Sequence, residues 1–260
     1  MDAEDCAPIL SVKDTIATIR LSRPAKANRL EADDLAELMR HFAAVDRDPA
    51  VRVVVLTGTG RHFCAGYDMS GFEDMAPLAG QPGPNPFEAV VNALAAVGKP
   101  VICAINGGMY GGAIDLALAC DHRVAVARTR ARMPALALGF QYYLDGLRRY
   151  VAIVGERATR RIFFDASEMS SEELLSLGVI DACVPDDAAL AQATQRKALA
   201  WQALAPLAVA GTKQVLLALR AAEVDEARLR LTERRILASE DFREGRQAWF
   251  EKRTPIFRGC

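Results

Sequence analysis

Two short glycine-containing segments hold residues whose types and spacing could do chemistry. The first, RHFCAGYDM (61–69), follows the apolar run 51–57, and the second begins a helix at Gly111 and Gly112. Backbone amides at a helix start have no partner within the helix, and the helix dipole favours negative charge there. If both segments follow neighbouring strands, two N–H donors meet over one crevice and can bind an oxyanion. The alternative is a tight strand-to-helix turn in which glycine serves only packing.

Asp115 is an acid inside an otherwise apolar helix, three residues after Gly112. Three residues make almost one helical turn, so Asp115 lies on the same face as Gly112 and leans toward the helix start. An acid at that place can point at a ligand bound by the glycine amides. The alternative is that Asp115 caps the helix or forms a local salt bridge.

Composition limits the classes of protein to which the chain can belong. With 260 residues and a formal net charge of −1, no overall field favours nucleic acid. The sequence contains no run of about 18 apolar residues, so no membrane span is expected. The acidic N-terminus does not resemble a signal peptide. The six cysteines form no CxxC pair and the three histidines are scattered. We therefore expect no metal site, and reduced core cysteines in a cytoplasmic protein.

The elements that must position these residues alternate between strand and helix over roughly the first 185 residues. An all-helical segment follows, so the pattern predicts an α/β core with a C-terminal helical region. The strands are expected as a hairpin in 9–21 and as strands at 51–58, 101–106, 122–127 and 179–185. The helices are expected at 31–45, 87–97, 112–120, 146–164 with a break near Gly155, 170–177, 187–204, 207–222 and 225–252.

Five stretches of the chain resemble the crotonase family, also called the enoyl-CoA hydratase/isomerase superfamily. They are RPAKANRL, FCAGYDM, AINGGMYGGAIDLALACDHRVA, SLGVIDACVP and EDFREGRQAWFEKRTPIFRG, in the family's order. The resemblance implies an α/β, ClpP-like spiral of ββα units with a C-terminal helical trimerisation region. It implies a core with the CoA site over 1–200 and a helical region over 201–260.

The resemblance also implies the chemistry. The family binds an acyl-CoA thioester and stabilises its enolate between two backbone amides, which fall here on Tyr67 and Gly112. Coenzyme A is then part of the substrate and no separate cofactor is expected. A homotrimer or a dimer of trimers is implied, with neither nucleic acid nor membrane as a partner.

The family's two catalytic glutamates are both changed in this sequence. The first falls on Asp115, which is one methylene shorter, and the second falls on Ala135, after Pro134. Ala135 cannot carry a proton or orient water, so a two-glutamate hydration is not expected. Our first interpretation is a single-acid variant that uses Asp115, such as a double-bond isomerase or an atypical hydratase.

The segment GFQYYLDGLRRY (139–150) suggests a sub-branch of the family. GGAIDL, a tyrosine three residues after Gly139 and the tail SEDFREGRQAWFEKR together resemble the methylmalonyl-CoA decarboxylases. There a tyrosine that aligns with Tyr142 orients the substrate carboxylate or handles the proton. Decarboxylation needs no glutamate pair, because loss of CO₂ itself makes the enolate. The alternatives are a buried wall residue for Tyr142 and, for Asp145, either a first-turn helix acid or a substitute catalytic acid.

Binding of CoA is implied for residues at two places. Adenine would lie against the loop that contains Ala65, Asp68, Met69 and Ser70, with Asp68 structural. Trp249 and Lys252 of the last helix would contribute, often from a neighbouring subunit. A third hypothesis is a CoA-thioester-binding or assembly protein with little catalysis.

Overall fold

The structure is a computed structural model that describes residues 5–68, 84–221 and 225–260. Its centre is a six-stranded sheet in the order β1-β2-β3-β5-β7-β10. The first two strands form the predicted antiparallel hairpin, and the remaining neighbours pair in parallel. The strands are β1 (Ile9–Lys13), β2 (Ile16–Leu21), β3 (Val53–Gly58), β5 (Val101–Ile105), β7 (His122–Val126) and β10 (Ala182–Val184).

Four very short strands form a second sheet, and along the chain they lie between strands of the first sheet. The second sheet has the order β4-β6-β8-β9 and consists of β4 (His62–Cys64), β6 (Gly108–Tyr110), β8 (Arg130–Arg132) and β9 (Met169–Ser170). Strands β4, β6 and β8 each follow a strand of the large sheet along the chain, and each precedes a helix. This repetition confirms the predicted spiral of ββα units.

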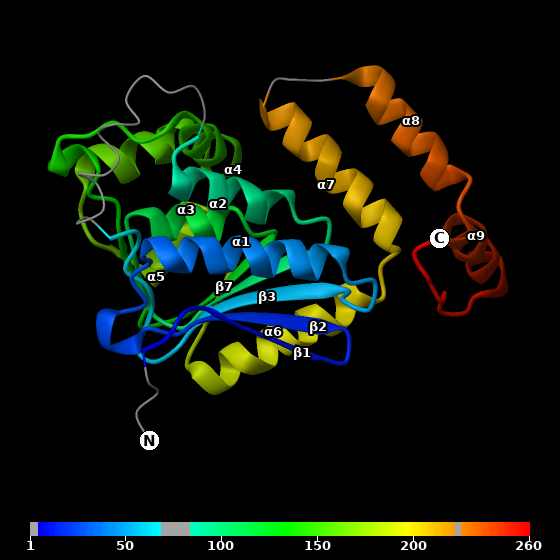
Figure 1. Cartoon of the computed structure of the whole chain (residues 1–260), viewed down its shortest axis with the longest axis horizontal. Coiled ribbons are helices and arrows are strands. Elements are labelled where there is room, and N and C mark those ends of the chain that lie inside the picture. Colours follow the sequence, from blue (N-terminus) through cyan, green and yellow to red (C-terminus); the bar gives the residue numbers. More distant parts are fainter. Residues whose placement is uncertain (1–4, 69–83, 222–224) are drawn as a thin grey trace.

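Helices cover both faces of the large sheet. In Figure 1, α1 (Ala32–Arg47), α2 (Pro86–Ala96) and α3 (Gly112–Leu118) lie on one face, and α6 (Asp187–Gln202) lies on the other. Alternate residues of each strand therefore enter two separate cores, as the strand period of two requires. All residues of β3 and β5 are buried, as predicted for strands covered on both faces.

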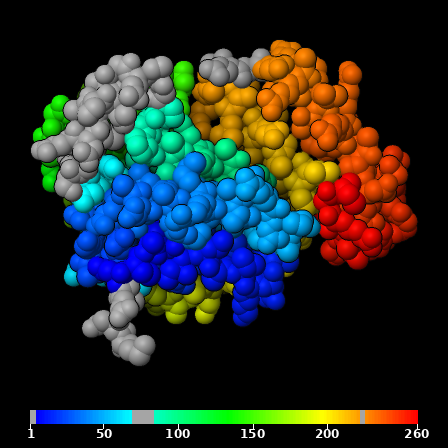
Figure 2. All heavy atoms as spheres, viewed as in Figure 1, coloured from blue at the N-terminus to red at the C-terminus, as the bar shows by residue number. Residues whose placement is uncertain are grey.

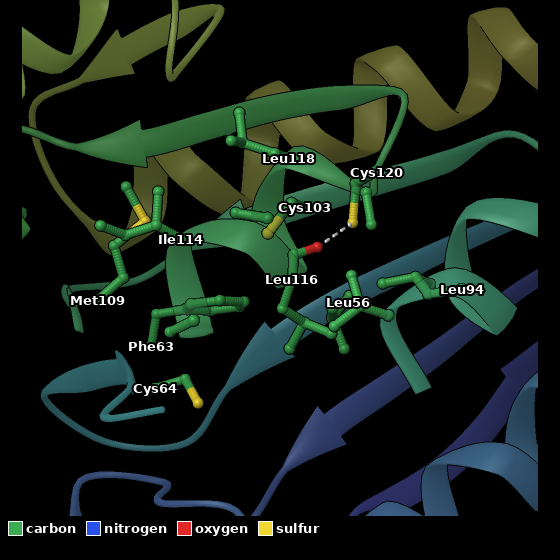
Figure 3. Close-up of a cluster of buried hydrophobic side chains, with 14 of the residues drawn as sticks. Leu56, Phe63, Cys64, Leu94, Cys103, Met109, Ile114, Leu116, Leu118 and Cys120 are labelled. Atoms are coloured by element: carbon green, nitrogen blue, oxygen red, sulfur yellow. Dashed lines mark hydrogen bonds between the residues drawn. The ribbon is translucent and has the colours of Figure 1, made fainter. Parts of the chain in front are cut away.

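The core around α3 consists of buried apolar side chains (Figure 3). Leu56 and Cys103 of the sheet face Ile114 and Leu116 of the helix, and the side chains of all four are fully buried. Cys64 and Cys120 are buried beside them, and burial raises the pKa of Cys64 to about 12. Cys6 and Cys260 are exposed, so the prediction that the cysteines are core residues is wrong for these two.

The helix α4 (Leu144–Asp165) carries the break predicted near Gly155, which has φ 78° and ψ 161°. It is followed by α5 (Ser171–Ser176), where Ser170 and Glu173 form the predicted capping box. Two short 3₁₀ turns, η1 (Pro24–Lys26) and η3 (Leu136–Leu138), complete this part of the chain.

Three helices form the C-terminal region: α7 (Pro206–Ala221), α8 (Glu226–Leu237) and α9 (Glu240–Glu251). Helix α7 packs on α2 and α4, whereas α8 and α9 extend away from the sheets (Figures 1 and 2). The prediction of one helix over 225–252 is wrong, because the chain breaks at Ala238 and Ser239. The Ser239 hydroxyl accepts a hydrogen bond of 3.1 Å from the amide of Phe242 and so begins α9.

Among the described residues, no single helix combines the length and apolarity of a membrane span. The bent pair α6 and α7 reaches both only when the two helices are counted together, across a 105° angle. Within the same residues no group of three or more His, Cys, Asp or Glu side chains is arranged to hold a metal ion.

Candidate active site

A pocket of about 200 Å³ lies where the segment after β4 meets the start of α3. Its walls come from the two glycine-containing segments, from α2 and from residues 133–143. The sequence predicted that the two glycine segments would meet over one crevice, and the structure places both in this wall.

Gly66 and Gly112 lie next to each other in the wall. Gly66 has φ 89°, and a Cβ on it would lie 2.7 Å from the Tyr110 carbonyl oxygen and 3.3 Å from the Gly112 nitrogen. A side chain would therefore push the two segments apart, which is why a glycine is needed at 66. The structure thus brings Tyr67, the residue after Gly66, to the start of α3, and both Tyr67 and Gly112 line the pocket.

The backbone on either side of Tyr67 is fixed by a short bridge to Leu30. The Leu30 amide donates to the Gly66 carbonyl at 2.9 Å, and the Asp68 amide donates to the Leu30 carbonyl at 2.9 Å. Gly112 is the first residue of α3, so its amide has no acceptor within that helix. A Cβ at Gly112 would lie 2.5 Å from the Phe87 ring, so this position also needs glycine.

Asp115 is fully buried and does not line the pocket. Its carboxylate forms a 2.7 Å ion pair with Arg149 Nη1, and both side chains have no exposed surface. The alternative for Asp115 was a local salt bridge, whereas the ion pair present joins it to Arg149, 34 residues farther along the chain on α4. The carboxylate also accepts a short hydrogen bond from the Tyr143 hydroxyl, and the Tyr142 hydroxyl lies 3.5 Å from the same oxygen.

Tyr142 and Tyr143 stand between Asp115 and the pocket, and both line it. Their rings stack with centroids 4.3 Å apart, and their hydroxyl oxygens are 3.3 Å apart. Burial raises the pKa of each phenol above its usual range, and the negative charge of Asp115 raises it further. Both tyrosines therefore carry their protons at neutral pH.

Asp145 lies in the first turn of α4 and does not line the pocket. Its carboxylate accepts hydrogen bonds from Asn92 Nδ2 at 2.7 Å and from Arg148 at 3.2 Å. The same Asn92 accepts a 2.7 Å hydrogen bond from Arg149 Nη2. Asp145 is thus a first-turn acid that holds Asn92, and Asn92 holds the buried Arg149.

The described part of the pocket wall carries no Asp, Glu, His, Lys, Arg or Cys side chain. Ala135 is fully buried in that wall, at the place where the resemblance put the second glutamate. The polar groups that the described residues offer there are the hydroxyls of Tyr67, Tyr110, Tyr142 and Tyr143, the amides of Asn85 and Gln141, and backbone groups. Such a wall can bind an oxyanion and donate protons, but it offers no carboxylate base.

The residues expected to bind CoA are spread over two places. Ala65 lines the pocket, and Asp68 forms a 3.1 Å ion pair with Arg29. Met69 and Ser70 lie outside the described residues. Trp249 is 82% exposed on α9, and Lys252 caps the end of that helix, which lies beyond α7 and well away from α3 in Figure 1. One chain alone does not bring Trp249 and Lys252 to the pocket.

Four residues at the site were missed by the sequence reasoning: Phe87, Asn92, Tyr143 and Arg149. Tyr143 had a signal, because it stands beside Tyr142 in the same YY pair. Arg149 had none, because an Arg-Arg pair in a helix is usually a solvated face. The contact of Arg149 with Asp115 spans 34 residues of sequence and depends on how α3 packs on α4.

Comparison with known proteins gives matches over almost the whole chain. The sequence model of the enoyl-CoA hydratase/isomerase family matches residues 11–259. The 2,3-dehydroadipyl-CoA hydratase of Escherichia coli (strain K12) is 30% identical over 258 residues, covering 96% of this chain and 98% of that protein. The short-chain-enoyl-CoA hydratase of Clostridium acetobutylicum is 29% identical, with coverages of 94% and 95%.

Solved structures agree with the fold. The structure of an enoyl-CoA hydratase/isomerase family protein from Hyphomonas neptunium superposes with a TM-score of 0.87 at 31% identity and covers 97% of both chains. An enoyl-CoA hydratase from Bacillus anthracis superposes with a TM-score of 0.85 at 26% identity and covers 98% of this chain and all of that one.

Proposed function

This chain belongs to the enoyl-CoA hydratase/isomerase, or crotonase, family of acyl-CoA enzymes. We propose that it stabilises a thioester enolate with the backbone amides of Tyr67 and Gly112. The observation that carries the proposal is the close approach of Gly66 to the Gly112 nitrogen inside the pocket wall. Two amides that meet at one point can donate to one oxygen. Removing one such donor typically reduces kcat by about 10²–10³.

The reaction class supported best is decarboxylation of a malonyl-type CoA thioester. The bond between the α-carbon and the substrate carboxylate breaks, CO₂ leaves, and the electron pair passes onto the thioester carbonyl as an enolate. That step needs an oxyanion hole and no base, which matches a described wall that carries four phenols and no carboxylate. A proton donated to the α-carbon then completes the product.

Tyr142 is the proton donor in this scheme. The Tyr143 proton is already committed to Asp115, whereas the Tyr142 hydroxyl makes only long contacts of 3.3 Å and 3.5 Å. Its proton can therefore turn toward the substrate. The phenolate left behind is favoured by the positive charge of Arg149, until solvent restores the proton.

A second candidate is double-bond isomerisation, the single-acid interpretation of Asp115. The hydrogen bond from Tyr143 to Asp115 favours it, because it offers a proton a path from the pocket to a carboxylate. Hydration, the activity for which the relatives from Escherichia coli and Clostridium acetobutylicum are named, is supported less. It would need groups that hold water where Ala135 stands.

The C-terminal helices support a proposal for assembly. Trp249, Phe250 and Ile256 are 82%, 76% and 72% exposed, a large apolar area on the last helix and the segment after it. We assign the CoA-site core to residues 1–200 and an assembly region to residues 201–260. In a homotrimer or dimer of trimers this region would be covered, and it would bring Trp249 and Lys252 to the CoA of a neighbouring subunit.

The experiment is a mass-spectrometric screen of the purified enzyme against a mixed pool of enoyl-, β-hydroxyacyl- and malonyl-type CoA thioesters. Loss of CO₂ from a malonyl-type thioester is the expected result. An isomer of unchanged mass would select the second candidate. Gain of water, or binding of thioesters without turnover, would contradict the proposal, and the latter would favour a CoA-thioester-binding protein.

A further inference from the structure

We infer that Arg149 is a positioning residue, which keeps Asp115 a hydrogen-bond acceptor and thereby sets the direction of the hydrogen bonds in the chain Tyr142–Tyr143–Asp115. The inference rests on the proposed function, because it concerns how the proton donor of that reaction is presented. Arg149 itself does not line the pocket, so it acts only through Asp115.

The guanidinium of Arg149 is held at two points. One nitrogen, Nη1, donates to Asp115 at 2.7 Å, and the other, Nη2, donates to Asn92 at 2.7 Å. Asn92 is fixed in turn by the 2.7 Å hydrogen bond to Asp145. The contact therefore ties α4 to α3 and α2 and leaves Arg149 no room to slide away from the carboxylate.

A buried ion pair is not needed for stability, because well-packed apolar residues of similar volume are often as stable or more so. The place of this pair gives it another consequence. An ionised carboxylate can only accept hydrogen bonds. Tyr143 must then donate to Asp115, and its oxygen faces the Tyr142 hydroxyl as an acceptor. Tyr142 is thus left as the phenol whose proton can turn into the pocket.

Removal of the Arg149 charge would reverse this order. A carboxylate buried without a cation takes up a proton, since burial disfavours its charged form. A protonated Asp115 could donate to Tyr143, and Tyr143 would no longer have to donate to it. Burial lowers the pKa of Arg149, but the charge of Asp115 outweighs this effect and raises that pKa, so Arg149 stays charged beside Asp115.

Other charged groups face this cluster but do not replace Arg149. Arg220 of α7 lies near enough to feel both Asp115 and Arg149, yet among the described ion pairs it makes none with Asp115. Its pKa is lowered by burial and by the Arg149 charge. The titratable and charged groups that face the Asp115–Arg149 pair are Tyr142 and Tyr143 just before α4, Asp145 and Tyr150 of α4, Glu88 of α2 and Arg220 of α7.

The test compares Arg149→Gln, Arg149→Lys and the double variant Asp115→Asn/Arg149→Gln in the full-length protein. Turnover of the malonyl-type thioester is measured against pH, and the carboxyl stretching band of Asp115 is followed by infrared difference spectroscopy, which needs no substrate. We expect Arg149→Gln to show a protonated Asp115 near neutral pH. Its rate should fall about tenfold for each pH unit below the new carboxyl pKa and recover above it. Arg149→Lys should keep the wild-type profile.

A wild-type pH profile in Arg149→Gln, without a carboxylic-acid band, would overturn the inference. If Arg149→Gln does not fold, the infrared difference spectrum between the wild-type protein and Asp115→Asn still tests the inference. A carboxylic-acid band of Asp115 in the wild-type protein would overturn it equally. The double variant removes both charges of the pair and should show neither the band nor the new pH dependence. Failure of the proposed function is seen separately, as a wild-type rate in Tyr142→Phe, while the infrared result stands on its own.

Discussion

Tyr142→Phe removes the hydroxyl that we propose as the proton donor and keeps the aromatic ring that packs in the core. Tyr142 is only 6% exposed and packs its ring against Tyr143, Tyr150 and Phe163, with centroids 4.3, 6.1 and 5.5 Å away. Phenylalanine keeps all three ring contacts. The hydroxyl loses two long contacts of 3.3 Å and 3.5 Å, so the free energy of unfolding should fall by no more than about 1 kcal/mol.

The effect on turnover should be far larger. A positioned general acid typically contributes about 10²–10⁴ in rate, which is roughly 3–5 kcal/mol in the activation barrier. We therefore expect kcat of Tyr142→Phe on a malonyl-type thioester to fall by about that factor. The KM should stay near the wild-type value, because no binding contact to CoA is removed. Steady-state release of CO₂ and the denaturant midpoint are the two measurements.

Tyr150→Phe is the matched control. Tyr150 is fully buried in the same aromatic cluster, and its hydroxyl has no hydrogen-bond partner among the described residues. Its loss should leave kcat unchanged and change the free energy of unfolding by no more than about 1 kcal/mol. A wild-type kcat in Tyr142→Phe, or an equal loss of kcat in both variants, would refute the assignment of the proton donor.

Three further predictions follow from the pocket and from the buried phenols. Gly112→Ala places a Cβ 2.5 Å from the Phe87 ring, so the amide at the start of α3 should shift. We expect kcat/KM to fall about tenfold or more. An unchanged kcat/KM would show that the Gly112 amide does not bind the oxyanion. Phe87→Ala opens the wall between Tyr67 and Tyr143, and should raise the relative kcat/KM for bulkier acyl groups in a chain-length series. The raised pKa values of Tyr142, Tyr143 and Tyr150 keep these phenols protonated in the folded state, whereas in the unfolded chain they ionise above about pH 10. Above that pH the free energy of unfolding should therefore decrease by up to about 1.4 kcal/mol per pH unit per tyrosine. The decrease should be less steep in Tyr142→Phe, which has one buried phenol fewer.

The sequence predicted those elements whose cause is local. The β-branched run of β3 indicated a strand buried on both faces, and Ser170 with Glu173 marked the start of α5. Strands of three residues, such as β4 and β6, are too short to show a period and were not predicted. The break at Ser239 was missed because helical periodicity continues on both sides of it.

In the site too, features with a local cause could be predicted from the sequence, and features that depend on helix packing could not. The glycines at 66 and 112 could be predicted to meet, since both follow parallel strands at the same sheet edge. The surroundings of Asp115 could not. Helical spacing predicted Asp115 on the same face as Gly112, but its carboxylate is buried away from the pocket, and its partners Arg149 and Tyr143 come from 34 and 28 residues farther along the chain. Only the packing of α4 on α3 decides whether such an acid meets the substrate or a buried arginine.

The central claim is that the amides of Tyr67 and Gly112 bind the thioester oxygen together. A crystal structure of the enzyme with a malonyl-type CoA thioester analogue that cannot lose CO₂ tests it most directly. We expect the thioester oxygen at about 2.7–3.1 Å from both nitrogens, with the Tyr142 hydroxyl facing the α-carbon. A thioester oxygen that contacts neither amide, or a thioester bound outside this pocket, would show that Tyr67 and Gly112 do not form the oxyanion site.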